Sequence, residues 1–177
     1  MEREFISVSI SLLTVSDTRK LDNDKSGDLL QERIQKSGHQ LIERSIVEDD
    51  INKIRKEVNV WVANDDIDVI ISTGGTGLTG RDVSPEAFRG LFNKEIEGFG
   101  ELFRYISFKK IGTSTIQSRA LAGVSNGKYI FVLPGSPSAC KDAWDEILVR
   151  QLDYRHKPCN FVEIMPRLLE RKKLNGR

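Results

Sequence analysis

The residues best suited to chemistry in this sequence gather around one glycine-rich segment. Positions 74–80 read Gly-Gly-Thr-Gly-Leu-Thr-Gly, and Asp82 follows two residues later. Glycines let backbone N–H groups turn inward and let a ligand approach without meeting a Cβ atom. A nearby carboxylate can hold Mg²⁺ against a phosphate. The segment therefore predicts a phosphate site; the alternative is a tight turn without a ligand, in which Asp82 makes only a local hydrogen bond.

The common phosphate motifs do not describe this segment. Gly75, Gly77 and Gly80 match the dinucleotide pattern Gly-x-Gly-x-x-Gly, but that match alone is weak. Ser84 and Pro85, a capping residue and a first-turn residue, open the next helix only beyond the last glycine, whereas a dinucleotide fold opens its helix within the glycines. The sequence contains neither the Gly-Lys-Ser/Thr of a Walker loop nor the Gly-x-Ser-x-Gly of a hydrolase elbow.

Other polar residues follow the ends of other expected strands. Asp49 comes shortly after the expected strand at 41–47, and Ser16 and Asp17 follow the first expected strand. The carboxyl ends of parallel strands share one edge of a sheet, so we expect Asp49 and Asp82 to converge there. A helix cap is the alternative role for Asp49, and a plain turn is the alternative for Ser16 and Asp17. Further candidates for phosphate contacts are Arg19, Arg81 and Arg119.

The elements that must position these residues alternate along the chain. Apolar runs at 6–12, 41–47 and 68–73 predict strands, and apolar residues at helical spacing predict helices from about Lys25 to Gly38 and over 51–62. Such alternation is typical of βαβ units with a largely parallel sheet. Further helices are expected after Ser84, over 99–108 and after Pro137. Asn126-Gly127 lies between two apolar runs and predicts an antiparallel hairpin.

Composition narrows the class of protein. The 177 residues carry a net charge of +1, and the 23 residues from Arg155 onward hold seven Lys or Arg against two Glu, which leaves a mildly acidic body. Such a body lacks the basic face that nucleic-acid binding requires. No apolar run approaches the roughly 20 residues that span a bilayer. Two cysteines, Cys140 and Cys159, and a charged N-terminus without a signal-peptide pattern predict a cytoplasmic protein.

Six short motifs together resemble one known family. They occur in family order and, with the sequence between them, cover the chain up to about Phe161. The motifs are Thr14–Arg19, Ser72–Gly77, Arg81–Ala87, Gly98–Glu101, Ser118–Ala120 and Leu133–Pro137. The chain is similar to the molybdopterin-binding family of molybdenum cofactor biosynthesis protein B and molybdopterin adenylyltransferase.

The resemblance implies a fold, an activity and site residues. The fold is a three-layer α/β/α sandwich, and the assembly is a homo-trimer or homo-hexamer. The activity is adenylylation of molybdopterin by Mg-ATP with release of pyrophosphate. By position, Asp49 and Asp82 support the metal and the reaction, and the remaining substrate and nucleotide residues are Ser16, Asp17, Gly74, Gly75, Thr76, Gly77, Ser118, Pro134, Gly135 and Ser136.

We expect one domain over residues 1–161 and a basic C-terminal tail over 162–177. Two other functions stay open at this point. One is an oligomeric carrier that binds the pterin phosphate without chemistry, and the other is a scaffold that uses the tail. The presence of both Asp49 and Asp82 favours the enzyme, because a carrier has no need of a paired acidic site.

Overall fold

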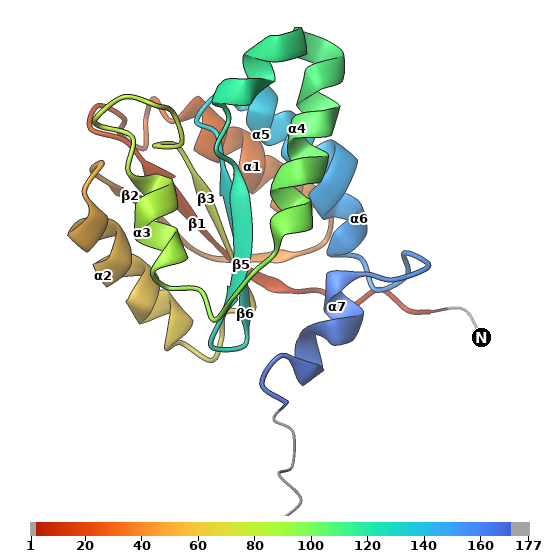
Figure 1. Ribbon diagram of the computed structural model, residues 1–177. Helices are drawn as coiled ribbons and strands as arrows, with labels where there is room; N and C mark the ends of the chain where they lie inside the picture. Colours follow the sequence, from red (N-terminus) through yellow and green to blue (C-terminus); the bar gives the residue numbers. More distant parts are fainter. Residues whose placement is uncertain (1–2, 171–177) are drawn as a thin grey trace, which may run out of the picture.

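A mixed sheet of six strands runs through the middle of the computed structural model, which describes residues 3–170 (Figure 1). The strands are β1 Ser9–Val15, β2 Gln40–Val47, β3 Val69–Thr73, β4 Lys94–Glu95, β5 Leu121–Ser125 and β6 Lys128–Leu133, in the spatial order β2-β1-β3-β6-β5-β4. The pairs β1–β2, β1–β3 and β3–β6 are parallel, and β5 pairs antiparallel with both β6 and β4. The mostly parallel sheet is thereby confirmed, and β1, β2, β3 and β6 all end at one edge.

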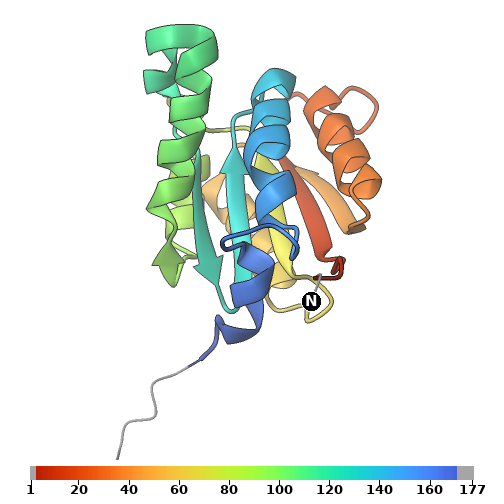
Figure 2. The same cartoon turned by 90° about the vertical axis from the view of Figure 1, so that its right-hand side faces the viewer.

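Helices cover both faces of this sheet and complete the expected three layers (Figure 2). One face carries α1 Lys25–Lys36, α4 Glu97–Ile111, α5 Pro137–Ala143, α6 Val149–Gln151 and α7 Phe161–Ile164, and the other carries α2 Ile51–Val62 and α3 Ser84–Arg89. Short turns of other helix types are η1 Gly112–Gln117, η2 Trp144–Leu148 and η3 Met165–Arg167. Within residues 3–170, no helix combines the length and the apolar character that crossing a membrane requires.

Each central strand supplies both halves of the core. In β3, Val69 and Ile71 pack toward α1 and α5, whereas Ile70 packs toward α2. An interior strand is buried on both faces, so it loses the apolar–polar alternation by which a strand is recognised. For this reason β1 extends to Val15, beyond the alternating run at 6–12 from which it was predicted. The layer on the α2 side closes around Trp61, which is almost fully buried.

The predicted hairpin is present between β5 and β6. Asn126 and Gly127 at its tip have φ angles of 46° and 80°, and positive φ at both central residues is what a type I′ turn requires. The β5–β6 pair lies beside the parallel strands, so the hairpin ends the parallel part of the sheet.

The segment after Phe161 begins against the core. Val162 is 6% exposed, the Tyr129 hydroxyl donates to the carbonyl of Phe161 at 2.9 Å, and Arg3 pairs with Glu163. Residues 162–170 therefore pack with the domain, and the part of the expected tail at 171–177 lies outside the described residues.

Replacing Gly127 by alanine tests the hairpin turn. A Cβ atom at this positive φ is strained and would stand 2.9 Å from Cγ of Leu169. We expect the free energy of unfolding to fall by about 1–2 kcal/mol, measured by urea denaturation. Gly98→Ala in α4, where a Cβ meets nothing within 4 Å, is the control and should be neutral or slightly stabilising. Equal effects of the two substitutions would contradict the turn assignment.

Candidate active site

A cavity of about 250 Å³ lies where β1, β2, β3 and β6 end. The loops that follow all four strands contribute to it, as expected from a parallel sheet. Eight of the residues expected from the sequence line it: Ser16, Arg19, Asp49, Gly74, Gly75, Arg81, Asp82 and Gly135. The two acids that the sequence placed at separate strand ends therefore face one space.

Asp49 faces the cavity because its neighbour caps the helix. Asp50 is the N-cap of α2, and its Oδ1 accepts from the backbone N–H of Lys53 at 2.8 Å. The backbone N–H of Asp49 donates to Asp17 at 3.1 Å, which connects the loop after β2 to the loop after β1. The cap role left open for Asp49 thus belongs to Asp50, and the Asp49 carboxylate is free for another function.

The two acids lie directly over the glycine turn. A Cβ atom built on Gly75 would stand 2.8 Å from Oδ1 of Asp49, and one built on Gly77 would stand 2.7 Å from Oδ2 of Asp82. Side chains at these glycines would displace the carboxylates. The turn is therefore glycine-rich partly because the acids need the space above it.

The environments of the two acids move their pKa values in opposite directions. Burial raises the pKa of Asp49, and the negative charges of Asp17 and Asp82 raise it further. Burial also acts to raise the pKa of Asp82, but hydrogen bonds from Thr79 and the backbone of Gly77, with the charge on Arg119, leave it below its ordinary value. Asp82 is thus a firmly held anion, and Asp49 is the more easily protonated member of the pair.

Two arginines hold the loop around these acids. Arg119 donates from Nε to the carbonyl of Gly77 and from Nη2 to the carbonyl of Asp82, both at 2.8 Å, and also pairs with Glu86. Arg81 pairs with Asp17 and lines the cavity. Arg119 therefore fixes the backbone of the loop, while Arg81 lies at the cavity wall where an anion can reach it.

The turn itself depends on backbone contacts that exclude side chains. Gly74 and Gly75 have φ angles of 102° and 64°, a region that other residues rarely adopt. Ser84 was expected to cap α3, but no side chain caps that helix. The Ser84 hydroxyl instead donates to the carbonyl of Gly74 at 2.8 Å, and the Ser84 N–H donates to the carbonyl of Gly75. The carbonyl of Gly74 lies in a buried turn and needs a hydrogen-bond donor, and Ser84 supplies it in place of a cap for α3.

A buried polar network under the cavity was not anticipated from the sequence. Thr14 donates to Asp24 at 2.6 Å, and Asp24 also accepts from the N–H of Gly27 and pairs with Arg44 at 3.0 Å. Ser26 donates to the carbonyl of Gly135 at 2.7 Å. The available signal was the position of Asp24 directly before the predicted helix, which identifies a cap but not the contact with β1.

The remaining expected residues lie around the cavity rather than in it. Asp17 supports Asp49 and Arg81, as described above. The carbonyl of Thr76 accepts from Arg119, the carbonyl of Pro134 accepts from Thr73, and Ser136 caps α5. Ser118 lines a separate cavity of about 390 Å³ near β5, and its buried hydroxyl has no hydrogen-bond partner among residues 3–170. The structure thus brings the acids and glycines together and sets Ser118 apart.

The two carboxylates suit a magnesium ion that substrate and water also coordinate better than a metal ion held by protein ligands alone. Within residues 3–170, no group of three or more His, Cys, Asp or Glu side chains is arranged to hold a metal ion. Magnesium commonly uses only one or two protein carboxylates, and substrate phosphates and water complete its shell. Asp49 and Asp82 provide that number of carboxylates beside the glycine turn.

Comparisons with known proteins agree with this architecture. A family model described as a probable molybdopterin binding domain matches residues 5–154. The molybdenum cofactor biosynthesis protein B of Escherichia coli strain K12 is 51% identical over 158 residues, which are 89% of this chain and 93% of that protein. Its counterpart in Halalkalibacterium halodurans is 46% identical and covers 84% and 88% of the two chains.

Solved structures of similar proteins have the same fold. A crystal structure of molybdenum cofactor biosynthesis protein B superimposes with a TM-score of 0.82 at 41% identity and covers 85% of this chain and 94% of the other. The tungsten cofactor synthesizing protein MoaB of Pyrococcus furiosus gives a TM-score of 0.70 at 35% identity, with 80% and 91% covered. Because the family model and these relatives span most of the sequence, the chain belongs to the molybdopterin-binding domain family of molybdenum cofactor biosynthesis.

Proposed function

We propose that this protein binds molybdopterin and adenylylates it with Mg-ATP. The observation that carries the proposal is the meeting of Asp49 and Asp82 over one glycine turn, with the nearby cap supplied by Asp50 instead. A protein that only carried the pterin phosphate would gain nothing from two carboxylates there, because they repel an anion. The acids therefore support chemistry with a bound cation.

In the reaction proposed, an oxygen of the pterin's terminal phosphate attacks the α-phosphorus of ATP. The bond from that phosphorus to the β-phosphate oxygen breaks, and the electron pair leaves with pyrophosphate. Asp49 and Asp82 would hold Mg²⁺, which offsets the charge of the two phosphates. Backbone donors of the turn and Arg81 would orient the anions, and such alignment can contribute about 7–11 kcal/mol. No proton transfer is needed at the attacking oxygen, since that phosphate is ionised.

Replacing each acid by its amide tests this assignment. Asp49→Asn and Asp82→Asn should each lower pyrophosphate release from molybdopterin, ATP and Mg²⁺ by about 100-fold or more, while binding of the pterin largely survives. Asp50→Asn is the matched control, because asparagine caps a helix as well as aspartate does. Full release by either test variant would remove that residue from the mechanism. Pterin binding by the unmodified protein without any pyrophosphate release would support the carrier instead.

The pH response of Asp49 gives an independent test, since it must be ionised to hold a cation. The charge of Asp17 raises the pKa of Asp49, and the charge of Arg81 lowers it. Asp17→Asn should therefore move the titration of the Asp49 carboxyl to lower pH, and Arg81→Gln should move it to higher pH. Carboxyl-carbon NMR of the metal-free protein measures both shifts. Shifts of the same sign in the two variants would contradict the charge arrangement described here.

We also propose that copies of the chain associate as a trimer or hexamer through α4. Exposed apolar side chains recur at three-residue spacing along this helix, and η1 adds another; they are Leu102, Tyr105, Phe108, Ile111 and Ile116. The end of α4 and η1 project past the edge of the sheet (Figure 1). Large apolar surfaces of this kind mark protein interfaces.

The two free cysteines, Cys140 and Cys159, support a cytoplasmic location for the protein, because disulfides are rare in that reducing compartment.

Placing a charge on this helix tests the assembly. Phe108→Glu should lower the molar mass measured by sedimentation equilibrium, because burial of a carboxylate in an apolar interface is unfavourable. Val60→Glu is the control, since Val60 is similarly exposed but stands on α2 across the sheet. An unchanged mass for Phe108→Glu, or equal dissociation of both variants, would rule out α4 as the interface.

A further inference from the structure

Four polar side chains that line the active-site cavity are almost fully buried. None is more than 4% exposed, and they come from the ends of β1 and β3 and from the start of α1: Thr14, Asp24, Ser26 and Thr73. A buried polar group is costly unless it forms hydrogen bonds. The partners of these four side chains, here called the buried polar set, therefore indicate what the set does.

The three hydroxyl groups of the buried polar set donate to acceptors within the protein. Ser26 donates to the carbonyl of Gly135 at 2.7 Å, and Thr73 donates to the carbonyl of Pro134 at 2.9 Å. The Thr14 hydroxyl donates to the carboxylate of the same set at 2.6 Å. A hydroxyl has only one proton to donate. These three groups therefore have none left for a phosphate oxygen, and direct binding of an anion is not their role.

Asp24 lines the cavity too, but both of its carboxylate oxygens have partners. As the N-cap of α1, it accepts from the N–H of Gly27 at 3.0 Å through Oδ1. Its Oδ2 accepts from Thr14 and pairs with Arg44 at 3.0 Å. In this respect it differs from the two acids over the glycine turn. Asp24 therefore holds the first turn of α1 in place rather than coordinating a cation.

The first turn of α1 in turn holds the loop that follows β6. Ser26 stands in that turn and binds the loop through the carbonyl of Gly135. A Cβ atom on Gly135 would stand 3.2 Å from Cα of Gly74, so this loop lies directly against the glycine turn. Gly135 also lines the cavity. A shift of the loop would therefore change the space in which the substrates align.

We propose that Asp24 and Ser26 are positioning residues of the adenylyl transfer, which act through the loop at 134–136. Asp24 fixes the first turn of α1, and the Ser26 hydroxyl in that turn keeps Gly135 against the glycine turn. The inference rests on the proposed function, because two phosphates must be aligned for the reaction to occur. A misplacement of about 1 Å can lower a reaction rate about 100-fold.

Removing one hydroxyl group from the full chain tests the proposal. Ser26→Ala should lower kcat for pyrophosphate release about tenfold or more, while the Kd values of Mg-ATP and molybdopterin change much less. Amide hydrogen exchange at Gly135 and Ser136 should become faster. Ser7→Ala is the matched control, because Ser7 also donates to a glycine carbonyl, that of Gly38 at 2.9 Å, but stands before β1 at the other end of the sheet. Its kcat and the exchange of the loop should not change.

A second variant tests the role of Asp24. Asp24→Asn keeps the cap of α1, because asparagine caps a helix as well as aspartate does, but it removes the charge that faces Arg44. It should lower kcat, and adding Arg44→Gln should recover part of the loss, because a buried charge without its partner is more harmful than the absence of both. If Asp24 held Mg²⁺ itself, the second substitution would restore nothing, and that result would contradict the positioning role.

The outcomes separate this inference from the reaction. An unchanged kcat in Ser26→Ala would overturn the positioning role and leave the adenylyl transfer standing. A loss of substrate binding as large as the loss of kcat would also overturn it, by making Ser26 a binding residue. Faster exchange of the loop in Ser26→Ala, without pyrophosphate release by the unmodified protein, would support the contact between α1 and the loop while contradicting the adenylyl transfer.

Discussion

The whole site depends on how closely the backbone packs where the central strands end. A Cβ atom on Gly74 would stand 2.2 Å from the carbonyl oxygen of Val15, and one on Gly135 would stand 3.2 Å from Cα of Gly74. Three corners, after β1, β3 and β6, thus touch through main-chain atoms. This proximity leaves no room for side chains between the three loops and draws the residues that follow each strand into one small cavity.

Such crowding has an electrostatic consequence. Asp49, Asp17 and Asp82 follow β2, β1 and β3, three successive strands of the sheet, and are therefore forced near one another. The surroundings of each carboxyl then set the direction of its pKa shift. Asp82 has donors from its own loop and stays a stable anion, whereas Asp49 has the charges of two other carboxylates close to it. Arg81, held by Asp17, is the nearby cation that partly offsets them. Such a cavity therefore suits a cation bound together with an anionic ligand better than it suits an anion alone.

The sequence predicted the features that follow from local periodicity and from parallel strands. The helices α1 and α2, the hairpin at Asn126-Gly127 and the shared edge for Asp49 and Asp82 follow from hydrophobic spacing, turn chemistry and one topological rule. Features set by contacts between distant segments were not visible. The two-residue strand β4 carries no pattern of its own, and its pairing with β5 defines it.

The same distinction applies to individual site residues. Asp49 and its neighbour Asp50 both precede the helix in the sequence, and only the structure identifies the cap, because it is Asp50 that accepts from the N–H of Lys53. Ser84 has a capping position but donates to Gly74, because the carbonyl of that buried turn needs a partner. The resemblance lists Ser118 among the substrate and nucleotide residues, yet it lines a different cavity from the two acids. The sequence thus identifies the loop in which a residue lies but not the direction in which its side chain points.

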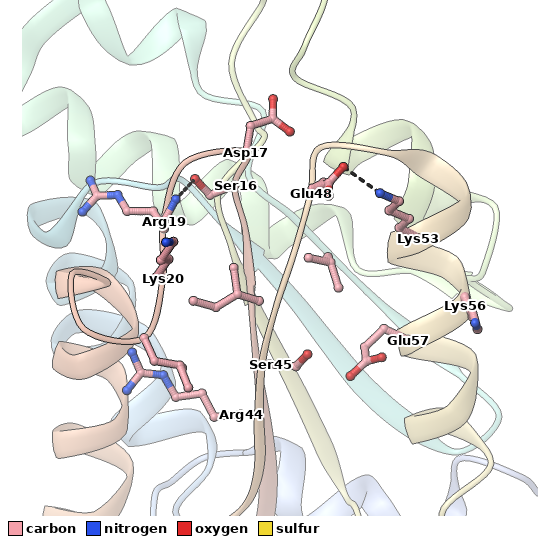
Figure 3. Close-up of a pocket in the computed structure, with 13 residues that line it drawn as sticks. Ser16, Asp17, Arg19, Lys20, Arg44, Ser45, Glu48, Lys53, Lys56 and Glu57 are labelled. Atoms are coloured by element: carbon pink, nitrogen blue, oxygen red, sulfur yellow. Dashed lines mark hydrogen bonds and ion pairs between the residues drawn. The ribbon is translucent and has the colours of Figure 1, made fainter.

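A charged contact lies between the active-site cavity and a second space, the groove of about 710 Å³ over the outer edge of β2 (Figure 3). Asp24, 1% exposed, lines the first space, and its partner Arg44, 13% exposed, lines the second. A buried ion pair is weak evidence for stability, because desolvation offsets most of the attraction, but it holds geometry firmly. Thr14 and the N–H of Gly27 supply the remaining hydrogen bonds of Asp24. The pair therefore fixes the start of α1 against β1 and β2, and the distance between the two spaces follows from it.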